Sequence, residues 1–182
     1  MNKKIRTVFA ICTTFASSGL LAQTCFNDQP ASHLDGQFVD RHDGTILDVV
    51  NSLLWSKCNV GETYDAATNS CNGTPSYFAT WQDALIATQD TAITTIGNLP
   101  GFRMPNIKEL ASIVDYRCYA PAIDLSLFSS TINAPYWSNT PDEHQVHTQF
   151  GYEGLLINFT SGEEFDQLKN GIVVMRLVRK FE

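Results

Sequence analysis

The cysteines are the residues of this sequence with the most clearly defined chemistry. Cys12 lies in an N-terminal apolar run, and Cys25, Cys58, Cys71 and Cys118 follow it. Four cysteines in an exported chain predict two disulfides, for which three pairings exist. We favour Cys58 with Cys71, which closes a polar loop, and Cys25 with Cys118, which holds the N-terminal segment. Zinc is the weaker alternative, because no C-x-x-C pair is present.

Motifs of catalysis are missing from the sequence. It contains no G-x-S-x-G, no H-E-x-x-H and no phosphate-binding loop. If all four cysteines of the mature chain form disulfides, no thiol nucleophile remains. Glu163 and Glu164 are adjacent, so in a strand their carboxylates would point to opposite faces. The sequence therefore predicts a protein that is not an enzyme.

Carboxylates around a tight turn could bind calcium. Asp40, Asp43 and Asp48 surround such a turn, but their spacing does not match an EF-hand loop. Aspartate followed by glycine is also what a β-hairpin requires, and we favour that interpretation. His144 and His147 are interpreted as solvated loop histidines. We expect no metal site and no cofactor, with calcium as a weaker alternative.

Two aromatic residues are candidates for ligand contact. Tyr136 and Trp137 adjoin a long loop that follows Cys118, and binding residues tend to gather on loops. Trp55 and Trp81 lie in apolar or amphipathic runs, which indicates core positions. Burial in the core is the competing interpretation for Tyr136 and Trp137 as well.

The segment "GFRMPNIKEL" combines a chain break with a helix start. Pro105 ends the preceding structure, Asn106 can cap a new helix, and Glu109 completes a capping box. Arg103 could bind a carboxylate ligand through its planar guanidinium. An internal ion pair is the favoured alternative. We therefore interpret Arg103, Pro105, Asn106 and Glu109 as a structural corner.

The remaining patterns predict two helices and several antiparallel strands. Apolar residues at helical spacing predict helices over 79–90 and 106–116. Glycine-containing turns at 43–44, 161–162 and 170–171 predict hairpins. We expect an α+β domain, in which the two helices pack on antiparallel β-sheets with long loops and the first and last strands pair.

The N-terminus has the pattern of a secretory signal peptide. Three cationic residues precede an apolar run over 7–22 that is too short and polar to span a bilayer. We expect cleavage after Ala22, which leaves residues 23–182 as a single domain without membrane insertion. Lipidation at Cys25 is the weaker alternative, because "AQTC" lacks the residues that should precede a lipidated cysteine. The protein would be periplasmic, on the cell surface or secreted.

The net charge argues against polyanionic partners. The chain carries −7 at pH 7 and becomes more negative once the signal peptide is removed. Such a charge repels nucleic acid and anionic lipid. It also disfavours sulfated polysaccharides, unless basic residues cluster on one face.

Seven segments, in order, resemble one bacterial domain family. They are "FVDRHDGTILDVVNSLLWSKC", "TWQDAL", "GFRMPNIKELASIVDY", "PAIDLSLF", "YWSNT", "INFTSGE" and "VMRLVR", and they span roughly residues 38 to 179. The family is that of the Lcl C-terminal domain, formerly called DUF1566 and named after a collagen-like adhesin. The resemblance implies a Gram-negative source and a fold related to C-type lectin-like domains and formylglycine-generating enzymes. The reactive cysteine pair of those enzymes has no counterpart here.

The resemblance also implies a role. The adhesin binds host glycans, so we expect an exported, non-catalytic binding module whose loops over 119–153 recognise a glycan or a surface protein. Asn139, Asp142 and Glu143 lie in a region comparable to the calcium-dependent sugar motifs of lectins, although those motifs do not align. The alternatives are an accessory subunit of a cell-envelope or pilus-like assembly and, more weakly, an enzyme of the formylglycine-generating group.

Overall fold

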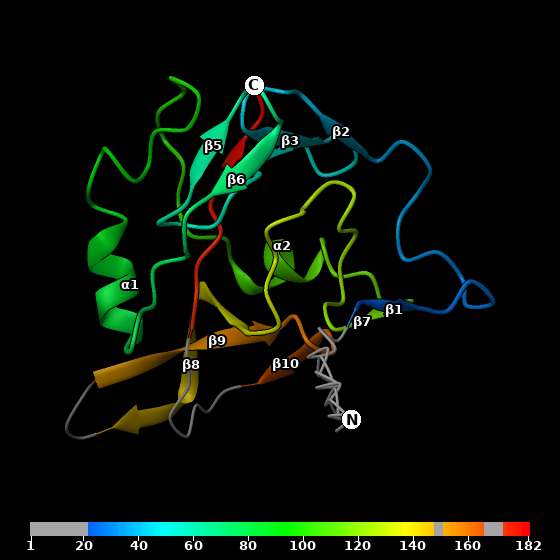
Figure 1. Cartoon of the computed structure of the whole chain (residues 1–182). Helices are drawn as coiled ribbons and strands as arrows, with labels where there is room; N and C mark the ends of the chain where they lie inside the picture. Colours follow the sequence, from blue (N-terminus) through cyan, green and yellow to red (C-terminus); the bar gives the residue numbers. More distant parts are fainter. Residues whose placement is uncertain (1–21, 148–150, 166–172) are drawn as a thin grey trace, which may run out of the picture.

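Strands and two small helices make up the described part of the protein (Figure 1). The computed structural model describes residues 22–147, 151–165 and 173–182, without the side chains of 143–147 and 151–152. Nearly all of the predicted signal peptide lies outside these residues. Within them the structure is an α+β mixture in which strands predominate.

The first sheet has four antiparallel strands. They are β2 (Phe38–Asp40), β3 (Thr45–Asp48), β4 (Leu53–Ser56) and β11 (Val178–Lys180), in the order β11-β4-β3-β2. The predicted turn at Asp43-Gly44 joins β2 to β3, and Gly44 has φ +86°, a conformation that favours glycine. The last strand pairs with β4, whereas the first strand of the chain, β1, lies in another sheet. The expected pairing of the first and last strands is therefore wrong.

The second sheet contains the longest hairpin. Its strands are β8 (Pro135–His147), β9 (Gly151–Asn158) and β10 (Glu163–Phe165), in the order β10-β9-β8. The predicted turn at 161–162 lies between β9 and β10. The turn predicted at 170–171 lies outside the described residues. Residues 140–144, predicted as a loop, belong to β8, where Pro141 faces Gly154 of β9 between two register shifts.

Two small sheets lie beside the disulfides. One pairs β1 (Thr24–Cys25) with β7 (Cys118–Tyr119), and the other pairs β5 (Thr63–Asp65) with β6 (Ser70–Asn72). Both predicted disulfides are confirmed. Cys25 faces Cys118 across the β1–β7 pair, and Cys58 is bonded to Cys71 of β6.

Both helices begin at a capping residue. In α1 (Trp81–Ala87), the side chain of Thr80 accepts a hydrogen bond from the Asp83 N–H. The second helix, α2 (Ile107–Ala111), ends earlier than the spacing predicts. Ile113 and Val114 are nevertheless buried, so the apolar pattern identified core residues correctly but overestimated the length of the helix.

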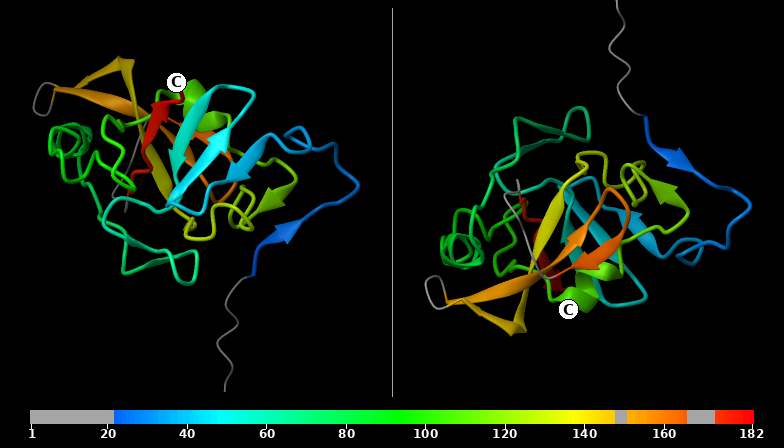
Figure 2. Two further views of the ribbon diagram at one scale, coloured as in Figure 1. Left: turned by 90° about the horizontal axis from the view of Figure 1, so that it is seen from above. Right: turned by 90° about the horizontal axis from the view of Figure 1, so that it is seen from below.

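The two larger sheets lie on opposite sides of α2 (Figure 1). Both helices contact β8 and β9, and α1 stands above the hairpin that these strands form (Figure 1). The two views in Figure 2 show the β1–β7 pair at one end of the molecule, away from the C-terminus. Among the described residues, no helix is long and apolar enough to cross a membrane.

The core divides into two apolar clusters because the strands are buried on both faces. Leu53 and Trp55 belong to one cluster, and Leu54 between them belongs to the other. Tyr136 and Trp137 divide in the same way. Successive side chains of a strand point to opposite faces, so continuous apolar runs are needed to fill both clusters.

Candidate functional site

The corner at residues 103–109 is a closed network of hydrogen bonds. The Arg103 guanidinium donates to both carboxylate oxygens of Glu109, at 2.7 and 2.8 Å. Glu109 also accepts from the Asn106 N–H, and the Asn106 side chain accepts from the Glu109 N–H, so the predicted capping box is present. Burial by itself would raise the pKa of Glu109, but the bonds from Arg103 and Asn106 together lower it.

This corner forms one wall of an open groove. The groove has a volume of about 510 Å³ and lies between α2, the β3–β4 turn and the C-terminus. We call it the C-terminal groove; its lining includes Asn51, Asn106, Lys108, Glu109, Lys180 and Phe181. Amide, ammonium and carboxylate groups thus surround one aromatic ring that is 43% exposed. Such a combination can bind hydroxyl-rich ligands through hydrogen bonds and ring contact.

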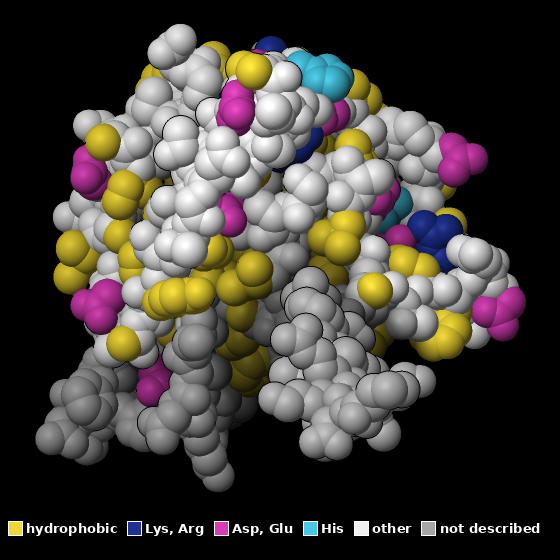
Figure 3. All heavy atoms as spheres, viewed as in Figure 1, with side chains coloured by type: hydrophobic (Ala, Val, Ile, Leu, Met, Phe, Trp, Pro, Cys, Tyr) yellow, Lys and Arg dark blue, Asp and Glu magenta, His cyan; other side chains and the backbone are white. Residues whose placement is uncertain are grey.

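Most of the accessible cationic side chains in the described residues gather around this groove. Lys108 and Lys180 line it, and the Arg41 guanidinium carbon lies 5.7 Å from the centre of the Phe181 ring. Arg103 pairs through its backbone with Val178, the residue that precedes Arg179 and Lys180. By contrast, acidic side chains are spread over the face drawn in Figure 3. Glu109 and Glu182 also line the groove, so its two ammonium groups are matched by two carboxylates.

Tyr136 and Trp137 do not face a ligand surface. Tyr136 is fully buried, and its hydroxyl accepts a hydrogen bond from the Ile132 N–H. Trp137 is 4% exposed, and its indole N–H donates to the Phe78 carbonyl. The structure thus corrects their assignment as ligand-binding residues, because paired strands on both sides place them in the two core clusters.

The polar candidates of β8 separate in space. Asn139 is exposed and its backbone N–H donates to the Pro105 carbonyl, which ties β8 to the corner. Asp142 is buried. The side chain of Glu143 lies outside the described residues, as do those of His144 and His147. Among the described candidates of this segment, only Asn139 presents its side chain to solvent.

The three aspartates at the first hairpin serve separate structural contacts. Asp40 accepts a bond from Lys57, Asp43 accepts from Thr45, and Asp48 accepts from the backbone N–H groups of Val50 and Asn51. Each carboxylate is thus engaged by protein donors at a different point of the sheet. These contacts agree with the interpretation of the segment as a hairpin.

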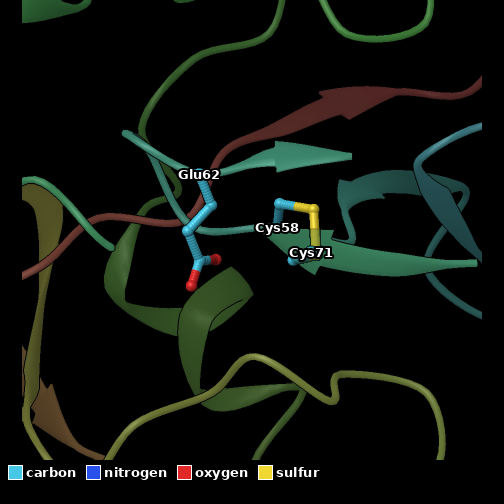
Figure 4. Close-up of side chains that lie close together, drawn as sticks. All are labelled: Cys58, Glu62 and Cys71. Atoms are coloured by element: carbon cyan, nitrogen blue, oxygen red, sulfur yellow. A yellow bond between two sulfur atoms is a disulfide. The ribbon is translucent and has the colours of Figure 1, made fainter. Parts of the chain in front are cut away.

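Cys58, Glu62 and Cys71 lie close enough together to resemble a metal site (Figure 4). The two sulfur atoms are bonded to each other, so neither is a thiolate that could bind zinc. The Glu62 carboxylate accepts a hydrogen bond from the Asn59 N–H at 2.8 Å. The group is a disulfide with a neighbouring turn-stabilising carboxylate.

Two groups of buried charges were missed at the level of sequence. Arg176 is 1% exposed and donates to Asn59, Thr131 and the carbonyls of Ser56 and Lys57. Its solitary position inside the apolar run "GIVVMRLV" could have indicated burial. Lys57 is buried against Asp40, which no local pattern shows, because Asp40 lies on β2 and Lys57 follows β4, 17 residues further along the chain.

Comparison with known protein families assigns the chain to a family. The fold and the groove define a small disulfide-linked domain with a polar surface groove. Residues 44–179 match the Lcl C-terminal domain family, and the chain belongs to this family. Comparison with curated proteins yields no match, and neither does comparison with solved structures.

Proposed function

We propose that the protein is an exported, non-catalytic binding module that holds a glycan in the C-terminal groove. The observation that carries this proposal is the composition of the groove, in which Asn51, Asn106, Lys108 and Lys180 surround the exposed ring of Phe181. Sugars present hydroxyl groups at their edges and apolar C–H faces, and these two kinds of surface require such partners.

The two disulfides support two parts of this proposal, namely export of the protein and a function that does not use a reactive thiol. All four cysteines after residue 22 are paired, and disulfides persist in oxidising compartments. Paired cysteines offer no thiolate nucleophile. A C-type lectin-like fold is part of the proposal. Its support is the pairing of the C-terminal strand β11 with β4 in the N-terminal half of the chain. The two short helices and the two disulfides give further support.

The groove also suggests which glycans bind best. Lys108 is exposed, and no described residue forms a hydrogen bond or ion pair with its ammonium group. Glu109 and Glu182 line the groove beside Lys108 and Lys180, so the groove offers both hydrogen-bond donors and acceptors. A neutral, hydroxyl-rich saccharide therefore suits it better than a strongly anionic one.

A glycan array followed by calorimetry tests this function. We expect binding of neutral glycans by the mature protein, weakened at least about tenfold by Phe181→Ala and by the Lys108→Ala/Lys180→Ala pair. Tyr116→Ala is the matched control, since this aromatic residue is 65% exposed outside the groove. The control should change the dissociation constant less than about twofold.

The proposal fails if no glycan binds. It also fails if a bound glycan is insensitive to the groove variants, or if only a protein ligand is captured. The last result would favour the envelope-assembly alternative.

A further inference from the structure

A second group of polar side chains lies beneath the Cys58–Cys71 loop, away from the function proposed above. The Asp40 carboxylate oxygen Oδ2 accepts hydrogen bonds from Lys57 Nζ at 2.5 Å and from Asn69 Nδ2 at 2.8 Å. The carbonyl oxygen of the same Asn69 amide accepts a bond from the Tyr64 hydroxyl at 2.7 Å. Every polar atom of the Asn69 side chain is therefore held by a group that could take part in acyl transfer.

Each member has the chemistry of a distinct role. An amine is a nucleophile, and a carboxylate that bridges the amine and an amide nitrogen can move a proton from one to the other. A hydroxyl that donates to the amide oxygen stabilises the negative charge that develops there. We propose that Lys57 Nζ and Asn69 Cγ form an intramolecular isopeptide bond, with Asp40 as the proton carrier and Tyr64 as the oxyanion donor.

The reaction balances without a co-reactant. A proton moves from Lys57 Nζ to Asp40, and the free amine attacks Asn69 Cγ. The tetrahedral intermediate carries its negative charge on Oδ1, facing Tyr64. Asp40 then returns the proton to Nδ2, the Cγ–Nδ2 bond breaks, and ammonia leaves with the second proton of the amine as ammonium. The products are a secondary amide, ammonium and the restored Asp40 carboxylate.

The fold holds the reacting groups in place. Lys57 precedes Cys58, and Asn69 lies two residues before Cys71, so the disulfide tethers both backbones. Tyr64 pairs with Cys71 across the β5–β6 hairpin, and the Lys57 N–H donates to the Gly44 carbonyl. Because the fold holds the amine and the amide close together, the reaction is intramolecular and has a high effective concentration.

Burial shields the proton path from water, whereas the charges make the first proton transfer an uphill step. The Lys57 side chain is 3% exposed and that of Asp40 is 14% exposed, so water competes little for their hydrogen bond. Desolvation by itself would raise the pKa of Asp40, but the bonds from Lys57, Asn69 and the His42 N–H lower it. The resting state is thus an ion pair. Desolvation and the charges of Asp40 and Asp43 raise the pKa of Tyr64, which keeps its hydroxyl a donor.

The bond would join residues 57 and 69 beside the disulfide between 58 and 71. Unlike that disulfide, it would survive reduction. The loop would then remain closed wherever the disulfides are reduced, and unfolding of this part would stay restricted.

Peptide mapping of the folded, purified protein tests the proposal. After reduction, alkylation and digestion, we expect one branched peptide that contains Lys57 and Asn69 and is lighter than its two parts by one ammonia. Loss of ammonia from the whole chain is not sufficient, because cyclisation of an N-terminal Gln23 or of Asn72 before Gly73 gives the same change. The fragment spectrum must therefore place the linkage between the two side chains.

Variants test whether loss of the branched peptide reflects loss of the reacting groups or a failure to fold. Lys57→Arg retains a cation for Asp40 but cannot form the amide, and Asn69→Ala removes the electrophile; both should abolish the branched peptide. Asp40→Asn should slow its formation about 100-fold or more. Asn72→Ala in the same hairpin is the control and should retain it. Both disulfides are verified in each variant by mapping without reduction.

Three results would overturn the proposal. One is recovery of the Lys57 and Asn69 peptides as separate, unmodified species from correctly disulfide-bonded protein. Another is a linkage between Lys57 and Asp40 with loss of water. The third is a branched peptide that forms at an unchanged rate in Asp40→Asn.

Discussion

Arg103 and Arg176 show two ways in which this fold accommodates an arginine. The Arg103 side chain is 39% exposed and binds the Glu109 carboxylate through two parallel hydrogen bonds. Arg176 is enclosed in the protein, where its guanidinium donates to neutral oxygens and lies 5.1 Å from the centre of the Phe128 ring. No described carboxylate forms a salt bridge with Arg176.

The difference shows what each environment requires. Near the surface, a single carboxylate neutralises Arg103 and water solvates the remainder of the guanidinium. In the interior, several oriented dipoles and a ring face must replace water around Arg176. Burial lowers the pKa of Arg176, whereas the hydrogen bond to Glu109 raises that of Arg103. Arg176 thus joins β4, the 57–59 turn and Thr131 into one unit.

The largest expected effect comes from Arg176→Met. The apolar side chain fills much of the space, but Asn59, Thr131 and the Ser56 carbonyl lose their donor inside the protein. We expect the free energy of unfolding to fall by about 3–5 kcal/mol in urea denaturation. A loss below about 1 kcal/mol would show that these acceptors find other donors and would remove the distinction between the two arginines.

A smaller effect is expected from Asn106→Ala at the corner. This variant removes the side-chain acceptor of the capping box and leaves the Glu109 N–H without its partner. Thermal and urea unfolding should show a loss of about 1 kcal/mol. The nearby Lys108→Ala is the control, since its exposed side chain has no described hydrogen bond, and it should stay within about 0.5 kcal/mol of the parent protein.

The smallest effect, and the one with a pH signature, is expected from Arg103→Met. Solvent screening limits the Arg103–Glu109 pair to about 0.5–1 kcal/mol. Because the pKa of Glu109 is lowered in the folded state, the contribution is complete above its ordinary value near 4.5 and is lost as the pH falls through the folded value. The stability difference between parent and Arg103→Met should therefore be constant from about pH 6 to 8 and shrink below pH 4. A difference that grows on acidification would contradict the pairing.

Local features were predictable because neighbouring residues create them. The hairpin at Asp43-Gly44, the cap at Asn106 and the helix at Trp81 each depend on a few consecutive side chains and their own backbone. The length of α2 was not predictable in the same way, because Ile113 and Val114 are buried without helical structure around them. Apolar spacing reports burial, and more than one backbone conformation satisfies it.

Candidate ligand residues were harder to predict, since exposure depends on what covers each strand. Tyr136 and Trp137 looked like residues beside a loop, yet β9 pairs with them and Val174 forms a bridge to Tyr136. The C-terminal groove unites residues near positions 51, 108 and 181, which no local pattern connects. The cationic residues gather there only after β11 pairs with β4 and Arg103 reaches Val178.

The sequence by itself determined the turn and cap signals, the family and the mixed α+β class, because spacing and local chemistry are sufficient for each. It also favoured, among three possible pairings, the disulfides that the structure contains. Only the tertiary structure decided which polar groups meet. Arg176 finds its acceptors more than 40 residues away, and Asp40 of β2 meets Lys57 after β4 and Asn69 before β6. Burial and long-range partners are properties of the assembled sheets, and these properties decide whether a charged side chain binds a ligand, stabilises the core or reacts.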